Sequence, residues 1–79
     1  MKGEAFAEEV VIELAAAQAK HRPMHSLHEG LAVLWEEFEE AKAEVFKKHP
    51  DLTNLRKELV QIAAMAARMT VELIDSRKA

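Results

Sequence analysis

The sequence predicts an all-α fold made of three helices. Its composition favours helices over strands, with two Gly, two Pro, no Tyr and many Ala and Glu. Apolar residues recur at spacings of three and four in three successive segments. Proline or a capping residue separates these segments. The 79 residues are enough for one domain, expected to span 1–79, and too few for an enzyme with a separate cofactor domain.

The first helix is expected over residues 4–20, before Pro23. Its covered face is predicted from four apolar residues at helical spacing: Phe6, Val10, Leu14 and Ala17. Its glutamates Glu8, Glu9 and Glu13 are expected elsewhere on the surface. Ser26 and Glu29 form a capping box, in which the serine covers a free N–H and the glutamate reaches back to the cap residue. The second helix is therefore expected to start near residue 27.

The second helix is expected to run to about residue 48, because the residue before Pro50 is pushed out of helical geometry. Asp51 or Thr53 can cap the third helix, which is expected to reach about residue 75. Each of these two helices has a narrow apolar seam, typical of helices packing nearly antiparallel in a long hairpin. The first seam comprises Leu27, Leu31, Leu34, Phe38, Ala41 and Val45. The second comprises Leu55, Leu59, Ile62, Ala66, Met69 and Leu73.

Association with other copies is expected from the small size of the chain. A short chain buries a modest share of its surface, and the absence of cysteine excludes disulfides. Some apolar residues lie off the predicted seams: Val33, Trp35, Val60, Met65 and Val71. We expect a subunit interface to cover them. The simplest solution is an isologous dimer with a four-helix-bundle core, and a tetramer stays open.

Charge and hydropathy exclude several classes of partner. The chain has 11 basic and 14 acidic residues, a formal net charge of −3, so direct DNA binding is not expected. No apolar run approaches the roughly 18 residues that cross a membrane. The N-terminus leads into an acidic amphipathic segment instead of an apolar signal sequence. We therefore expect no membrane partner and a cytoplasmic location.

The carboxylates of the second helix carry the chemical prediction. Six glutamates and one lysine lie between residues 29 and 44. Glu37, Glu40 and Glu44 lie along one flank of the seam, whereas Glu36 and Glu39 point away from it. On the third helix Glu58 and Gln61 occupy the corresponding flank. If both flanks face one cleft, the carboxylates repel one another unless protons or a cation neutralise them, and oxygen ligands favour Mg²⁺ or Mn²⁺ over zinc.

These residues resemble a known family. The segment WEEFEE (35–40), followed 18 residues after Glu40 by ELVQ (58–61), resembles the all-α NTP pyrophosphohydrolases of the MazG-like superfamily. Their signature is E-x-x-E followed by E-x-x-D on the next helix. HEGLAVL (28–34) and RKELVQIAAMA (56–66) look closest to small MazG-like proteins of phages and mobile elements. The resemblance covers about residues 10–75.

The resemblance implies an oligomeric enzyme that hydrolyses nucleoside triphosphates to monophosphates and pyrophosphate with Mg²⁺, in a house-cleaning or nucleotide-pool role. It implies that Glu37, Glu40 and Glu58 are catalytic residues and metal ligands. Gln61 is the implied fourth metal ligand, at a position where the family usually has Asp. A neutral amide offers one carbonyl oxygen but no charge, and it cannot act as a base.

Two further functions remain open from the sequence. One is an altered or inactive MazG-like helical module that binds nucleotide or protein, because Gln61 replaces the family's Asp. The other is a small helical adaptor or antitoxin-like protein that covers its apolar flank with a different partner. Three basic residues are candidates for holding phosphates, although solvent-facing positions are expected for all of them: Arg56, Lys57 and Arg68.

Overall fold

The computed structural model describes residues 2–77, and all of its regular elements are helical. Three α-helices follow one another: α1 (Glu4–Lys20), α2 (Leu27–Val45) and α3 (Leu52–Arg68). A π-helical segment, η1 (Met69–Ile74), and a 3₁₀ turn, η2 (Asp75–Arg77), extend α3. The all-α prediction is confirmed for the described residues. Both ends of the expected 1–79 domain lie outside them.

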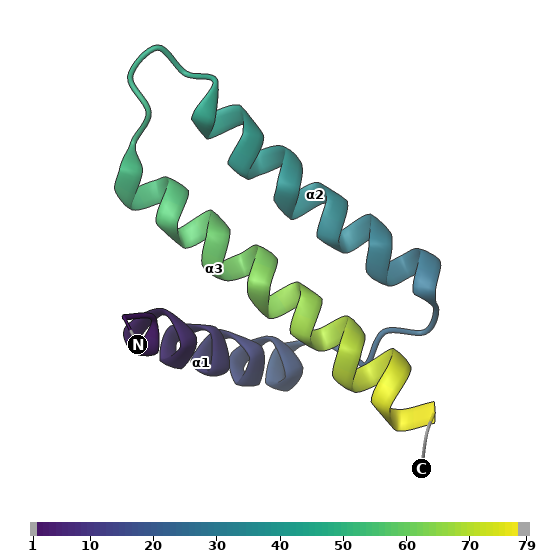
Figure 1. Cartoon of the computed structure of the whole chain (residues 1–79). Coiled ribbons are helices and arrows are strands. Elements are labelled where there is room, and N and C mark those ends of the chain that lie inside the picture. The colour runs from purple at the N-terminus through teal and green to yellow at the C-terminus, as the bar shows by residue number, and fades with distance from the viewer. Residues whose placement is uncertain (1, 78–79) are drawn as a thin grey trace.

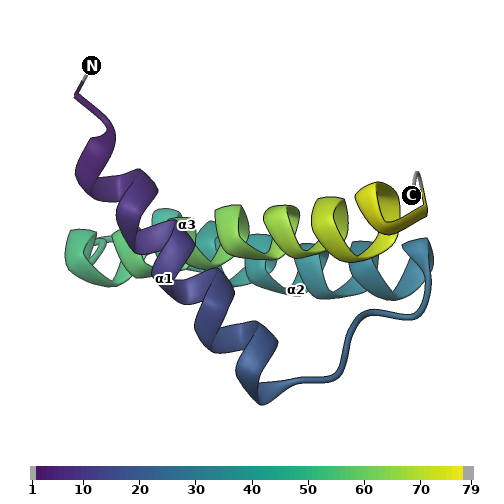
Figure 2. The same cartoon turned by 90° about the horizontal axis from the view of Figure 1, so that it is seen from below.

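The helices α2 and α3 lie side by side, and α1 crosses α3 at an angle (Figures 1 and 2). The chain turns back after α2, so the end of α2 lies beside the start of α3 (Figure 1). At the other end, the start of α2 meets η1 at Gly30. A Cβ on this glycine would lie 2.7 Å from Met69 Cγ, so the missing side chain allows a close approach. No described helix is long and apolar enough to cross a membrane.

The helix starts follow the local signals in the sequence. The Ser26 hydroxyl accepts a hydrogen bond from the Glu29 backbone N–H at 3.1 Å, which confirms the cap of α2. The Glu29 carboxylate reaches back to the His25 N–H at 2.5 Å, one residue further than a capping box requires. Asp51, not Thr53, caps α3 by accepting from the Asn54 N–H at 3.1 Å.

The expected end of the second helix, near residue 48, is wrong. The helix α2 stops at Val45 because Glu44 organises the following loop. The Glu44 side chain is 2% exposed and accepts hydrogen bonds from the Asp51 N–H at 2.9 Å and from Asn54 Nδ2 at 2.7 Å. These hydrogen bonds lower the pKa of Glu44 to about 2. Glu44 therefore joins the end of α2 to the start of α3.

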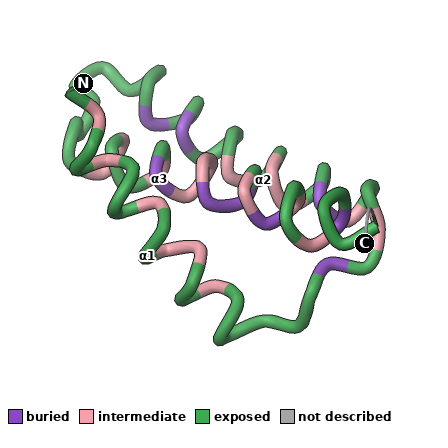
Figure 3. The backbone as a smooth tube through the Cα atoms, turned by 60° about the horizontal axis from the view of Figure 1, so that its bottom comes forward, coloured by how far each residue is buried: buried purple, intermediate pink, exposed green. Residues whose placement is uncertain are grey.

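The predicted seams also differ from the core. Buried residues gather along α3 and the parts of the chain that face it (Figure 3). The buried apolar residues are Met24, Ala41, Val60, Ala64, Met65 and Leu73. Val60 and Met65, expected at a subunit interface, are thus in the core of the chain. Four of the six seam residues of α2 are 46–54% exposed: Leu27, Leu31, Phe38 and Val45.

The connection between α1 and α2 is fastened to the end of α3. Arg68 and Glu72 form an ion pair at 3.1 Å, with side chains 6% and 9% exposed. Arg68 Nη2 also donates to the Arg22 carbonyl, and the Met24 N–H donates to Glu72 at 2.9 Å. The expectation that Arg68 faces solvent is wrong, because this arginine neutralises a buried carboxylate.

Candidate functional site

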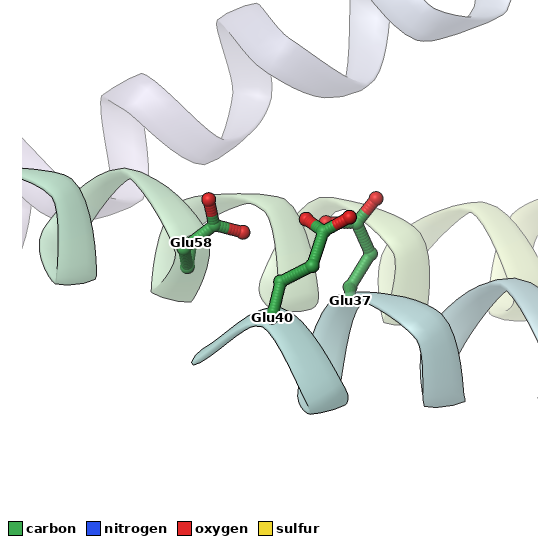
Figure 4. Close-up of side chains that lie close together, drawn as sticks. All are labelled: Glu37, Glu40 and Glu58. Atoms are coloured by element: carbon green, nitrogen blue, oxygen red, sulfur yellow. The ribbon is translucent and has the colours of Figure 1, made fainter. Parts of the chain in front are cut away.

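Two neighbouring helices bring three carboxylates together. Glu37 and Glu40 are one turn apart on α2, and Glu58 extends from α3 beside them (Figure 4). One carboxylate oxygen from each residue lies within 4.8 Å of the other two. We call these three residues the acidic cluster. The expected convergence of Glu37, Glu40 and Glu58 is present in the structure, while their roles as catalytic residues and metal ligands stay predictions.

The environment of the acidic cluster opposes full ionisation. Glu40 is exposed, whereas Glu37 and Glu58 are half-buried. Desolvation, followed by the charges of Glu40 and Glu58, raises the pKa of Glu37 to about 7. Desolvation also raises the pKa of Glu58, with a further contribution from contact with the Glu40 carboxyl. Ionising all three carboxyl groups at neutral pH therefore costs free energy.

An unsatisfied oxygen lies in the same place. Glu58 Oε2 is buried and has no hydrogen-bond donor among the described residues. A buried carboxylate oxygen without a partner is costly and is normally satisfied by a donor, an ion or water. A divalent cation ligated by the three carboxylates would satisfy this oxygen and neutralise the repulsion. The donor set is all oxygen, as Mg²⁺ and Mn²⁺ prefer.

Gln61 has a partner that the sequence did not indicate. Its Nε2 donates a hydrogen bond to Glu13 Oε1 on α1. The expectation that Glu13 lies elsewhere on the surface is wrong, because the side chain is half-buried against α3. Gln61 remains a predicted metal ligand through its carbonyl oxygen. Its amide nitrogen, however, ties α1 to α3.

The remaining acidic residues of α2 have separate roles. Glu44, expected on the flank of Glu37 and Glu40, organises the loop as described above. Glu36 and Glu39 are exposed as expected, and Glu39 accepts from Trp35 Nε1 at 3.2 Å and pairs with Lys42 at 3.7 Å. These contacts leave Glu37 and Glu40 as the α2 carboxylates that face Glu58.

The raised pKa of Glu37 predicts how stability varies with pH. Below about pH 4.5 the group is protonated whether the chain is folded or unfolded. As the pH rises through 7, the folded chain must hold a charge that the unfolded chain holds more easily. Glu37→Gln removes this cost, so at pH 8 without metal it is expected to raise the free energy of unfolding by about 1–3 kcal/mol, reduced by solvent screening.

Urea denaturation at pH 5 and pH 8 measures this effect. The stability gain of Glu37→Gln should be larger at pH 8. Glu36→Gln makes the same charge change at an exposed position of α2 and should give a smaller gain. An equal gain for the two variants at pH 8 would contradict a specific cost at Glu37.

Known proteins give no independent guide to this site. The chain matches no family model, no curated protein and no solved structure.

Proposed function

We propose that this protein is a Mg²⁺-dependent nucleoside triphosphate pyrophosphohydrolase, which hydrolyses (d)NTP to (d)NMP and pyrophosphate. The observation that supports the proposal most strongly is the convergence of Glu37, Glu40 and Glu58 to within 4.8 Å. The resemblance of WEEFEE (35–40) and ELVQ (58–61) to the MazG-like superfamily supports the reaction type. A role in cleaning the nucleotide pool follows from that reaction.

In this proposal the acidic cluster holds the cation, with the Gln61 carbonyl as the fourth protein ligand. Bound Mg²⁺ supplies charge screening for phosphate oxygens and polarises the phosphoanhydride. A carboxylate of the cluster accepts the proton of the attacking water. The water oxygen bonds to the α-phosphorus as the bond to the leaving pyrophosphate oxygen breaks. Glu40 is the best placed for proton transfer, because it is the exposed member of the cluster.

Pyrophosphate release from a panel of NTPs and dNTPs tests the proposal. The wild-type chain should release pyrophosphate with Mg²⁺ or Mn²⁺ and lose this activity when the cation is chelated. Folding is checked by circular dichroism on the same sample. A folded sample without turnover on any nucleotide would contradict the enzymatic function.

The second candidate is a MazG-like helical module that binds nucleotide without hydrolysing it. The hydrogen bond from Gln61 Nε2 to Glu13 favours this alternative, because it gives Gln61 a role in joining α1 to α3 that needs no metal. The absence of a fourth negative charge also lowers the expected metal affinity. Nucleotide binding by calorimetry without pyrophosphate release would identify this function.

We further propose that two copies of the hairpin formed by α2 and α3 pack into a four-helix dimer. The exposed seam residues Leu27, Leu31, Phe38 and Val45 form one stripe along α2. Trp35, 62% exposed, borders this stripe. A contiguous apolar stripe on so small a chain favours burial against another copy. Cytoplasmic location and assembly beyond a dimer stay expectations from the sequence.

Phe38→Glu is expected to weaken this assembly by at least about tenfold in dissociation constant, because it buries a charge in the interface. Light scattering across a dilution series measures the change. Val11→Glu adds the same charge at an exposed residue of α1 outside the stripe and should leave the mass unchanged. A monomeric wild-type chain at all concentrations would contradict the dimer.

A further inference from the structure

A cavity of about 640 Å³ lies between α1 and the hairpin of α2 and α3, and it adjoins the acidic cluster. Glu37 belongs to both the cluster and the cavity wall. Glu13 and Gln61 line the cavity from α1 and α3. Lys20 and His21 line it where α1 ends. The volume is in the range of small-molecule sites.

Some charged side chains around this cavity form ion pairs, whereas others do not. Arg22 pairs with Glu29 at 2.9 Å, and Arg68 pairs with Glu72 at 3.1 Å. Across the described residues, the side chains of Lys20 and His21 make no hydrogen bond and no ion pair. The cavity thus has a carboxylate at the cluster and an unengaged cation at the end of α1.

We propose that Lys20, assisted by His21, binds the outer phosphates of the nucleotide's triphosphate chain. This inference rests on the proposed function and names residues that the metal site does not include. A triphosphate carries more negative charge than one divalent cation neutralises. Lys20 supplies a further positive charge, and the His21 ring offers a hydrogen-bond donor in either protonation state. The carboxylates cannot contact phosphate directly without repulsion, so a separate cation in the same cavity completes the site.

The position of Lys20 also connects substrate binding to α1. Lys20 is the last residue of α1. The hydrogen bond between Gln61 and Glu13 joins the middle of this helix to α3. This hydrogen bond links α1, which carries Lys20, to α3, which carries Glu58. In this proposal a triphosphate contacts both the cluster's cation and Lys20, whereas a monophosphate contacts one of them. The site accordingly favours a polyphosphate over a single phosphate.

Calorimetric titration with inorganic tripolyphosphate tests the inference, first without metal and then with Mg²⁺. We expect Lys20→Gln to weaken binding by about tenfold, the loss of one charged hydrogen bond. Lys20→Arg should retain most of the affinity. Lys48→Gln removes the same charge from an exposed loop position and should change the affinity less than about twofold.

Equal tripolyphosphate affinity of the wild type and Lys20→Gln would overturn the inference, as would failure of the wild type to bind. Titration with Mn²⁺ alone separates this result from the metal site. If Mn²⁺ binds and NTPs turn over but Lys20→Gln has no effect, only the inference fails. If Mn²⁺ does not bind and NTPs do not turn over, the proposed function fails, while tripolyphosphate binding without metal still reports on Lys20.

Discussion

The Glu40→Gln variant is expected to release pyrophosphate from NTPs at least about 100-fold more slowly than the wild-type chain. Glu40 lies between Glu37 and Glu58, in contact with both carboxyl groups (Figure 4). The substitution keeps the size of the side chain and removes its charge and its ability to accept a proton. In the proposed mechanism it therefore affects cation binding and proton transfer together.

The matched control for Glu40→Gln is Glu36→Gln, which changes the same charge on the same helix outside the acidic cluster. Its rate should stay within about threefold of the wild type, since exposed charges interact weakly across solvent. Initial rates at saturating Mg²⁺ and NTP provide the comparison. Unchanged turnover in Glu40→Gln would show that Glu40 takes no part in the reaction.

The Glu72→Ala variant is expected to lose about 3–5 kcal/mol of unfolding free energy, because it leaves the guanidinium of Arg68 buried without its partner. Burial raises the pKa of Glu72, but hydrogen bonds from Arg68, Met24 and Gln18 outweigh it and lower that pKa below its usual value. The loss is comparable to the whole stability of a small domain. Glu72→Ala should therefore be largely unfolded at 37 °C.

Urea or thermal denaturation of three variants separates the buried charge from other causes. The double variant Arg68→Met/Glu72→Leu removes both charges and should recover most of the stability. Glu39→Ala breaks the exposed pair with Lys42 and should cost less than about 1 kcal/mol. A loss below about 1 kcal/mol in Glu72→Ala would show that the buried pair does not hold the α1–α2 connection.

Helix positions could be predicted from the sequence because their signals are local. Ser26 caps α2 through a hydrogen bond to a residue three positions later in the chain. The bounds of α1 agree with the predicted residues 4–20, and Pro23 follows shortly after the end of this helix. The face of α1 that carries Phe6 and Leu14 is half-buried as predicted. Periodicity alone did not show which apolar face of α2 meets α3, because an exposed apolar stripe has the same spacing as a core seam.

Polar groups buried by distant partners could not be predicted. Arg68 contacts Arg22, 46 residues away, and Gln61 contacts Glu13, 48 residues away. No local pattern indicates either contact. The acidic cluster could be predicted from the sequence. The i, i+3 spacing of Glu37 and Glu40 places them on one face of α2, and the pairing of neighbouring helices brings Glu58 to the same place. The early end of α2 depended on Glu44, two of whose partners, Asp51 and Asn54, lie at the start of α3.

Titration of Mn²⁺ into the wild-type chain at pH 7.5 tests the acidic cluster most directly, with Glu58→Gln and Glu36→Gln beside it. We expect a Mn²⁺ site in the wild type and in Glu36→Gln, and a loss of affinity of at least about tenfold in Glu58→Gln. The same titration followed by calorimetry also reports proton release, since the raised pKa of Glu37 leaves part of the cluster protonated at this pH. Equal Mn²⁺ binding by all three chains, or none by the wild type, would contradict a metal centre formed by Glu37, Glu40 and Glu58.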